Sequence, residues 1–124
     1  MDREEFKHYR KMLGKTQLQM SQLLGTSIKA VHSYEQGWRT IPTHAERQMF
    51  FLISRLKENK KDLKPCWVIK KCLPETKSRC PAWEFKSGTL CWFINGTICE
   101  GIVHNNWKEK MVKCRSCDVF KAML

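Results

Sequence analysis

Apolar residues recur at helical spacing almost from the start of the chain, where Phe6, Tyr9 and Leu13 fall on one face. Asp2 offers a side-chain acceptor to the amides of a first helical turn. Gly14 is the kind of residue that ends a helix, because glycine adopts the left-handed conformation without strain. The pattern therefore predicts a first helix between Asp2 and Gly14.

Two short helices are predicted next. Thr16 and Gln19 have the spacing of a capping box at the start of QLQMSQLL, and Gly25 ends that segment. Ser27 is a helix cap for the following segment, IKAVHSYEQ, which Gly37 ends. Two short helices joined by a tight glycine turn are typical of a helix-turn-helix.

A long fourth helix, HAERQMFFLISRLKEN, is predicted after Thr43. Its apolar stripe repeats at spacings of three and four and contains Met49, Leu52, Ile53 and Leu56. The stripe can pack entirely on the three preceding helices. Part of it can also contact a second copy of the chain, so a homodimer is a possible assembly.

The composition changes near the middle of the chain. The stretch KENKKDLKP, residues 57–65, is polar and ends in proline, which is typical of a linker or exposed turn. All seven cysteines follow it. We therefore predict a helical domain over residues 1–60 and a cysteine-rich module over residues 64–124.

The cysteine-rich module contains a strong signal for a β-hairpin near residues 90–100. In LCWFINGTICE, Asn95-Gly96 suits a two-residue type I′ turn between two strands. Downstream, Asn106 and Glu109 have the spacing of a capping pair for a short helix, WKEKMVK. The predicted fold class is mainly α, with an N-terminal four-helix domain and a small α+β module.

The charge balance favours a polyanionic partner. The formal net charge is +11, from 23 basic and 12 acidic residues, and nucleic acid is the simplest such partner. A basic protein with no polyanionic partner would have the same balance.

Other classes find little support in the sequence. No apolar run approaches the ~20 residues needed to cross a bilayer, and the charged start MDREEFKHYRK does not read as a signal peptide. We expect no membrane partner and a cytoplasmic location, where thiols stay reduced. The sequence has no Ser/His/Asp set, no paired carboxylates in a glycine-rich setting and no phosphate loop, so we do not expect an enzyme.

The stretch KTQLQMSQLLGTSIKAVHSYEQGWRTIP resembles the helix-turn-helix of the XRE/Cro family of phage and bacterial repressors, over residues 5–45. The agreement comprises Thr16-Gln17, Gly25, Ser27, Val31, Tyr34, Glu35-x-Gly37-x-Arg39 and Pro42. The resemblance implies a sequence-specific DNA-binding transcription regulator. It also implies that the residue at the position of Gln17 anchors a phosphate.

The helical spacing indicates which side chains would face DNA. With Val31 and Tyr34 pointing inward, the outward residues of the third helix are Ser27, Ile28, Lys29, His32 and Ser33. Lys29 can donate to guanine, and Ile28 can contact a thymine methyl. Arg39 and Thr40, after the helix, are candidate contacts to the DNA backbone. A helix-turn-helix that serves protein docking is the alternative.

The second half resembles the small cysteine-rich "two-CW" module found beside bacterial signalling and regulatory domains. The match covers residues 66–119 and includes the two Cys-Trp pairs, Cys66-Trp67 and Cys91-Trp92. This resemblance implies a place in a regulatory protein but no particular chemistry.

The cysteines need an explanation. A module this small buries little apolar surface, so it usually needs disulfides or a bound metal for stability. Disulfides do not suit a reducing compartment, which leaves metal ligation by Cys66, Cys72, Cys80, Cys91, Cys99, Cys114 and Cys117. Cys114-x-x-Cys117 has the usual spacing of a metal-binding pair. The scattered spacing of the others slightly favours an iron–sulfur cluster over zinc. Buried, inert thiols are the alternative.

Two functions remain open from the sequence. In the first, the protein is a transcription regulator whose cysteine module senses redox state or metal supply. In the second, it is a DNA-binding or adaptor protein whose cysteine module is a structural zinc or partner-docking domain without sensing.

Overall fold

The computed structural model describes residues 1–57, 64–104 and 106–123. The chain divides into two compact units, Met1–Leu56 and Lys57–Leu124, called here the N-terminal and the C-terminal unit. The predicted mainly α class is confirmed, because the regular structure of the described residues is helical apart from one isolated β-bridge. Most of the predicted linker, residues 58–63, lies outside the described residues. No described helix is both long and apolar enough to cross a bilayer.

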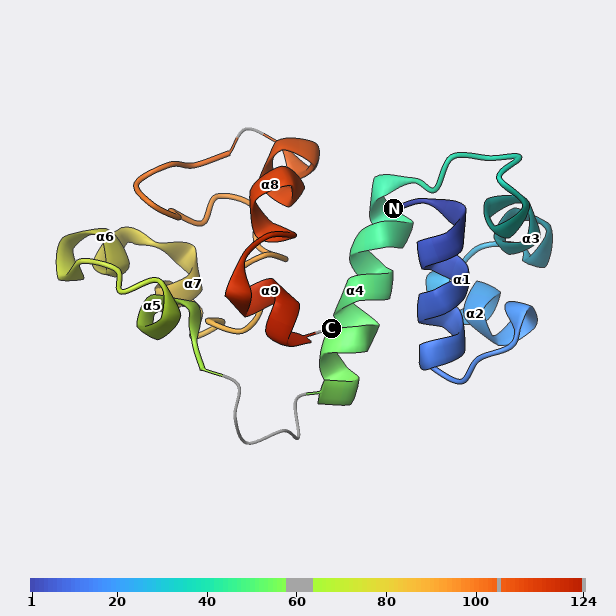
Figure 1. Ribbon diagram of the computed structural model, residues 1–124, viewed down its shortest axis with the longest axis horizontal. Helices are drawn as coiled ribbons and strands as arrows, with labels where there is room; N and C mark the ends of the chain where they lie inside the picture. Colours follow the sequence, from blue (N-terminus) through green and yellow to red (C-terminus); the bar gives the residue numbers. More distant parts are fainter. Residues whose placement is uncertain (58–63, 105, 124) are drawn as a thin grey trace. The chain divides into compact units, whose positions relative to one another are not determined.

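The N-terminal unit contains α1 (Arg3–Met12), α2 (Gln17–Leu24), α3 (Ile28–Gln36) and α4 (Thr43–Lys57) (Figure 1). Helix α3 packs against both α1 and α2. The short connection between α2 and α3 therefore leaves the two helices in direct contact, with one face of α3 open to solvent.

Local capping explains where the first three helices begin. The Thr16 hydroxyl accepts the Gln19 amide at 3.1 Å, and the Gln19 side chain accepts the Thr16 amide at 3.0 Å. The capping box predicted for α2 is therefore confirmed. Asp2 and Ser27 cap α1 and α3 with their side-chain oxygens. Gly25, at the end of α2, has a φ of 67°, a left-handed conformation that glycine adopts without a steric penalty.

The core of the N-terminal unit joins all four helices. The ring of Phe6 meets Tyr34 edge to face at 5.7 Å between centroids, and Tyr9 meets Phe50 in the same way at 5.7 Å. Side chains with no measurable exposure are Phe6, Met20, Val31, Met49, Phe50 and Ile53. Leu56, at the end of the α4 stripe, is 52% exposed. Most of the stripe therefore serves the interior of this unit.

The C-terminal unit is built from shorter helices: α5 (Cys66–Ile69), α6 (Pro74–Arg79), α7 (Pro81–Glu84), α8 (Trp107–Cys114) and α9 (Asp118–Met123). Helix α6 packs on α7, and α5 packs on α9. Trp92 is fully buried, with its ring edge-on to Phe120 at 5.6 Å and to Trp107 at 6.5 Å. This aromatic group forms the core of the unit.

The predicted β-hairpin near residues 90–100 is not formed. Residues 91–96 form turns, and the isolated bridge of the described residues joins Cys99 to Ile102. A lone two-stranded hairpin is at best marginally stable, whereas burial of the Trp92 ring is strongly favourable. The packing of Trp92 therefore overrides the local preference of Asn95-Gly96 for a hairpin turn.

Helix α8 begins where the sequence predicts. The Asn106 side chain accepts the Glu109 amide at 2.9 Å, which caps the first turn. This places Lys110 and Cys114 one helical turn apart on α8, so both side chains project to the same side of the helix.

The loop at Gly88 closes tightly against α5. The Gly88 carbonyl accepts the Cys66 amide at 2.9 Å. A Cβ atom on Gly88 would lie 2.4 Å from Cβ of Pro65 and 2.8 Å from the Trp67 ring, closer than atoms can approach. Only glycine therefore fits at this position. The hydrogen bond from the Cys66 amide to Gly88 holds the first residue of α5 against this loop.

Candidate functional site

The first candidate site is a concave surface on the N-terminal unit. It is lined by Gln17, Ile28, Lys29, His32, Ser33 and Trp38, and we call it the α3 face. Ile28, Lys29 and His32 are exposed, whereas Val31 and Tyr34 are buried, as predicted. Ser33, predicted to face outward, is half-buried. Ser27, also exposed, caps the same helix.

Trp38 is the member of the α3 face that sequence reasoning did not assign. Its side chain is 71% exposed, and its ring lies edge-on to His32 at 5.5 Å. The sequence did offer one indication of its position: Trp38 directly follows Gly37, the residue that ends α3.

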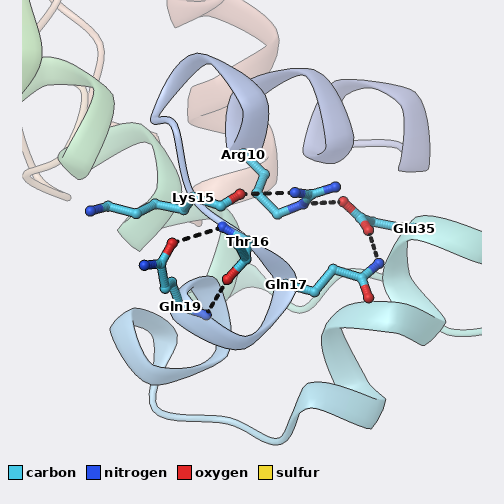
Figure 2. Close-up of polar contacts among 6 residues, drawn as sticks. All are labelled: Arg10, Lys15, Thr16, Gln17, Gln19 and Glu35. Carbon is cyan, nitrogen blue, oxygen red and sulfur yellow. Dashed lines mark hydrogen bonds and ion pairs between the residues drawn. The ribbon is translucent and has the colours of Figure 1, made fainter.

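A buried carboxylate holds Gln17 in place. Figure 2 shows the Gln17 side-chain amide donating to Glu35, which also accepts the Arg10 guanidinium at 2.5 Å. Arg10 donates in addition to the Lys15 carbonyl at 2.8 Å. The Glu35 side chain is only 3% exposed. Glu35, 18 positions further along the chain, therefore fixes the orientation of Gln17, and no local sequence pattern could predict that pairing.

Arg39 and Thr40 lie apart from the α3 face. Both are exposed and line a second hollow, together with Arg3 and Tyr34. The Arg3 guanidinium donates to the Gln36 carbonyl at 3.3 Å, near the C-terminal end of α3. Two arginines therefore flank this end of the helix.

The second candidate site is a cavity in the C-terminal unit with a volume of about 40 Å³, called here the cysteine cavity. A cavity of ~10–15 Å³ can hold one water molecule. The cysteine cavity is larger than that, so side-chain packing leaves open space inside it. Its lining includes all seven cysteines: Cys66, Cys72, Cys80, Cys91, Cys99, Cys114 and Cys117. Trp67 and Trp83, edge to face at 5.0 Å, form another part of the wall.

The thiols share the cysteine cavity without converging on one point. Among the described residues, no group of three or more His, Cys, Asp or Glu side chains is arranged to hold a metal ion. The sequence pattern identified the cysteines as a set, and the fold brings that set to one cavity.

Lysines are the unexpected members of the cysteine cavity. Lys70, Lys77 and Lys110 line it, and no Asp or Glu is found among its described lining residues. Lys110 is only 4% exposed and donates a hydrogen bond to the Thr97 hydroxyl. The signal for Lys110 was its position four residues before Cys114 on one helix.

Cys66 and Cys91 act as a pair. A hydrogen bond between their side chains lowers the pKa of Cys66 and raises that of Cys91, because the proton stays with Cys91. The Cys80 sulfur accepts the Ile98 amide at 3.3 Å.

Burial dominates at other cysteines. It raises the pKa of Cys99, an effect that the positive charge of Lys70 opposes. Burial also raises the pKa of Cys114, an effect that Lys110 opposes. It raises the pKa of Cys72 in the same way. A cation among these sulfurs would therefore favour their thiolate forms.

No protein-family model matches this chain, and comparison with curated proteins and with solved structures found no similar protein.

Proposed function

We propose that the protein is a sequence-specific, double-stranded-DNA-binding transcription regulator, and that its N-terminal unit is a helix-turn-helix domain of the XRE/Cro type. The α3 face carries this proposal, because the N-terminal part of α3 exposes Ile28, Lys29 and His32 around one concave surface. A recognition helix reads base edges with residues in this part of the helix.

Each exposed side chain has a role suited to a major groove. Lys29 donates to the O6 or N7 atoms of guanine, and Ile28 contacts the methyl group of thymine. His32 and Ser33 provide hydrogen bonds to bases or phosphates. Trp38, packed against His32, adds an apolar contact at the edge of the α3 face.

Other residues would position the helix on the DNA backbone. Gln17 lies at the start of α2, where free backbone amides favour a phosphate. Arg39 and Thr40 contact phosphates beyond the end of α3. The net charge of +11 adds attraction that does not depend on sequence.

A homodimer would present two α3 faces to two half-sites. Leu56 leaves apolar surface at the end of α4, which is available for contact with a second copy. Sedimentation of the full chain, alone and with an operator duplex, measures the stoichiometry.

The experiment is selection of duplexes from a random library by the full chain, followed by binding measurements at several salt concentrations. We expect an enriched motif bound far more tightly than a scrambled duplex. Equal affinity for all duplexes would contradict sequence-specific recognition. No DNA binding at low salt would contradict the whole proposal and favour protein docking.

The C-terminal unit would supply the signal through a metal centre in the cysteine cavity. The alternative is a DNA-binding or adaptor protein in which this unit is a structural zinc or partner-docking domain. Operator affinity, compared between metal-loaded and metal-free protein, separates the two. A change in affinity supports sensing, and unchanged affinity supports the alternative.

A further inference from the structure

We propose that the cysteine cavity binds an iron–sulfur cluster, with Cys99, Cys114 and Cys117 among its ligands and Lys110 as a buried counter-charge. This inference concerns the C-terminal unit alone, and its test does not depend on DNA binding.

The first support is the gathering of cysteines in space. They make up seven of the fifteen residues that line the cavity. They come from α5, from α8 and from loops far apart in the chain, so no single motif explains their meeting. Thiolates are the ligands that zinc and iron–sulfur clusters prefer. A cavity lined in this way has the chemistry of a metal site.

The second support is the spacing of the sulfurs. A single zinc ion needs four ligands around one point, with each sulfur about 2.3 Å from the metal. The thiols of the cysteine cavity surround a common space, but no three of them converge in this way. In a [4Fe–4S] cluster, unlike a [2Fe–2S] cluster, each of the four cysteines binds a different iron atom, so the sulfurs stand further apart. The arrangement therefore fits a polynuclear centre better than a single ion.

The ligand assignment follows from proximity. Cys114 ends α8, and the Cys117 amide donates to the Cys114 carbonyl at 2.9 Å, in a turn that keeps the two close. Cys99 is held by its β-bridge to Ile102. All three of these cysteines line the same cavity. The remaining ligands come from the other cysteines that line the cavity.

The third support is charge. A cluster held by thiolates is an anion. Of the three lysines that line the cavity, Lys70 is already paired with Glu100 at 3.3 Å, whereas Lys110 is buried beside the Thr97 hydroxyl. Burying a cation without a counter-charge is costly, and a hydroxyl compensates for only part of that cost. Neutral, inert thiols would leave Lys110 with Thr97 as its polar partner. An anionic cluster would instead supply the missing negative charge.

Two further contacts suit a cluster. The Ile98 amide donates to the Cys80 sulfur, and such hydrogen bonds to sulfur help to set cluster potentials. Trp67 and Trp83, both half-buried, form one part of the cavity wall. On binding, each ligand cysteine transfers its thiol proton to solvent and forms a sulfur–iron bond.

The test uses the full chain, purified without oxygen and then incubated with ferric iron, sulfide and a thiol reductant. We expect iron and sulfide in equal amounts and a broad thiolate-to-iron absorption band. Zinc retained in place of iron, or neither metal bound, would overturn the proposal. Replacing both Cys114→Ser and Cys117→Ser should abolish iron binding, and unchanged iron content would overturn the ligand assignment.

Lys110→Met provides a second readout if the cysteine variant fails to fold. Removing a positive charge beside the cluster disfavours its reduced form, so the reduction potential should become more negative. Lys108→Met is the matched control, because Lys108 is exposed on the same helix. Equal potentials in the two variants would overturn the role of Lys110.

Discussion

The side-chain amide of Gln17 donates a hydrogen bond to the carboxylate of Glu35, which joins the start of α2 to α3. The same carboxylate accepts the Arg10 guanidinium from α1 (Figure 2). One buried acid therefore fixes the mutual orientation of three helices, including the helix that carries the α3 face.

Replacing Glu35 with Gln should destabilise the N-terminal unit by about 3 kcal/mol. Breaking a buried ion pair typically costs ~3–5 kcal/mol, and the partial exposure of Arg10 favours the lower end. Urea unfolding of the full chain, followed by helical circular dichroism, measures the loss. Glu4→Gln is the control, because Glu4 is 80% exposed in its pair with Arg3 and should change stability by less than ~0.5 kcal/mol. Equal midpoints for both variants would contradict the bridging role of Glu35.

Lys29→Ala should weaken binding to the selected operator by about 1–3 kcal/mol, the usual value of one base contact. It should also relax the sequence preference at one base pair. Binding to a panel of single-base operator variants measures both effects. Lys7→Ala, an exposed lysine on α1, should leave the preference unchanged. If the two variants lose affinity equally for every duplex, Lys29 contacts only phosphate.

Arg39→Ala should weaken binding to all duplexes alike, because Arg39 is assigned to the DNA backbone. The slope of log affinity against log salt concentration should fall in magnitude by about 1 for one lost phosphate contact. Titrations at several salt concentrations give the slope, and Lys29→Ala provides the contrasting pattern. An unchanged slope would place Arg39 outside the interface.

A fragment of residues 1–57 should fold without the rest of the chain. The aromatic pairs Phe6–Tyr34 and Tyr9–Phe50 both lie within the N-terminal unit. Circular dichroism should show a cooperative thermal transition at the temperature of the corresponding transition in the full chain. A fragment that stays unfolded would mean that the C-terminal unit completes this core.

Local signals predicted the starts of four helices well, whereas Thr43, expected to precede the fourth helix, is its first residue. Asp2, Thr16, Ser27 and Asn106 all cap helices as expected, because a cap is a contact between residues three positions apart. The hairpin prediction was wrong for the opposite reason. The position of Trp92 depends on Trp107 and Phe120, which lie far along the chain and outside any local window.

The same contrast between local and long-range contacts decides which parts of the candidate sites could be predicted. Helical spacing was sufficient to separate exposed Lys29 and His32 from buried Val31, since all three lie on one helix. The gathering of the cysteines depends on the path of the loops, which spacing along the chain does not determine. Lys110 was within reach of prediction, because it lies one turn before Cys114 on a predicted helix.

The tight contact at Gly88 limits which residues the C-terminal unit can accept at this position. Every side chain begins with the Cβ atom that Pro65 and Trp67 exclude, so saturation mutagenesis at position 88 should return glycine alone. The carbonyl of the same residue accepts the Cys66 amide, so the constraint acts directly on the segment that carries the first cysteine. Any chain that shares this fold would therefore have to keep a glycine here, even where the spacing of its cysteines differs.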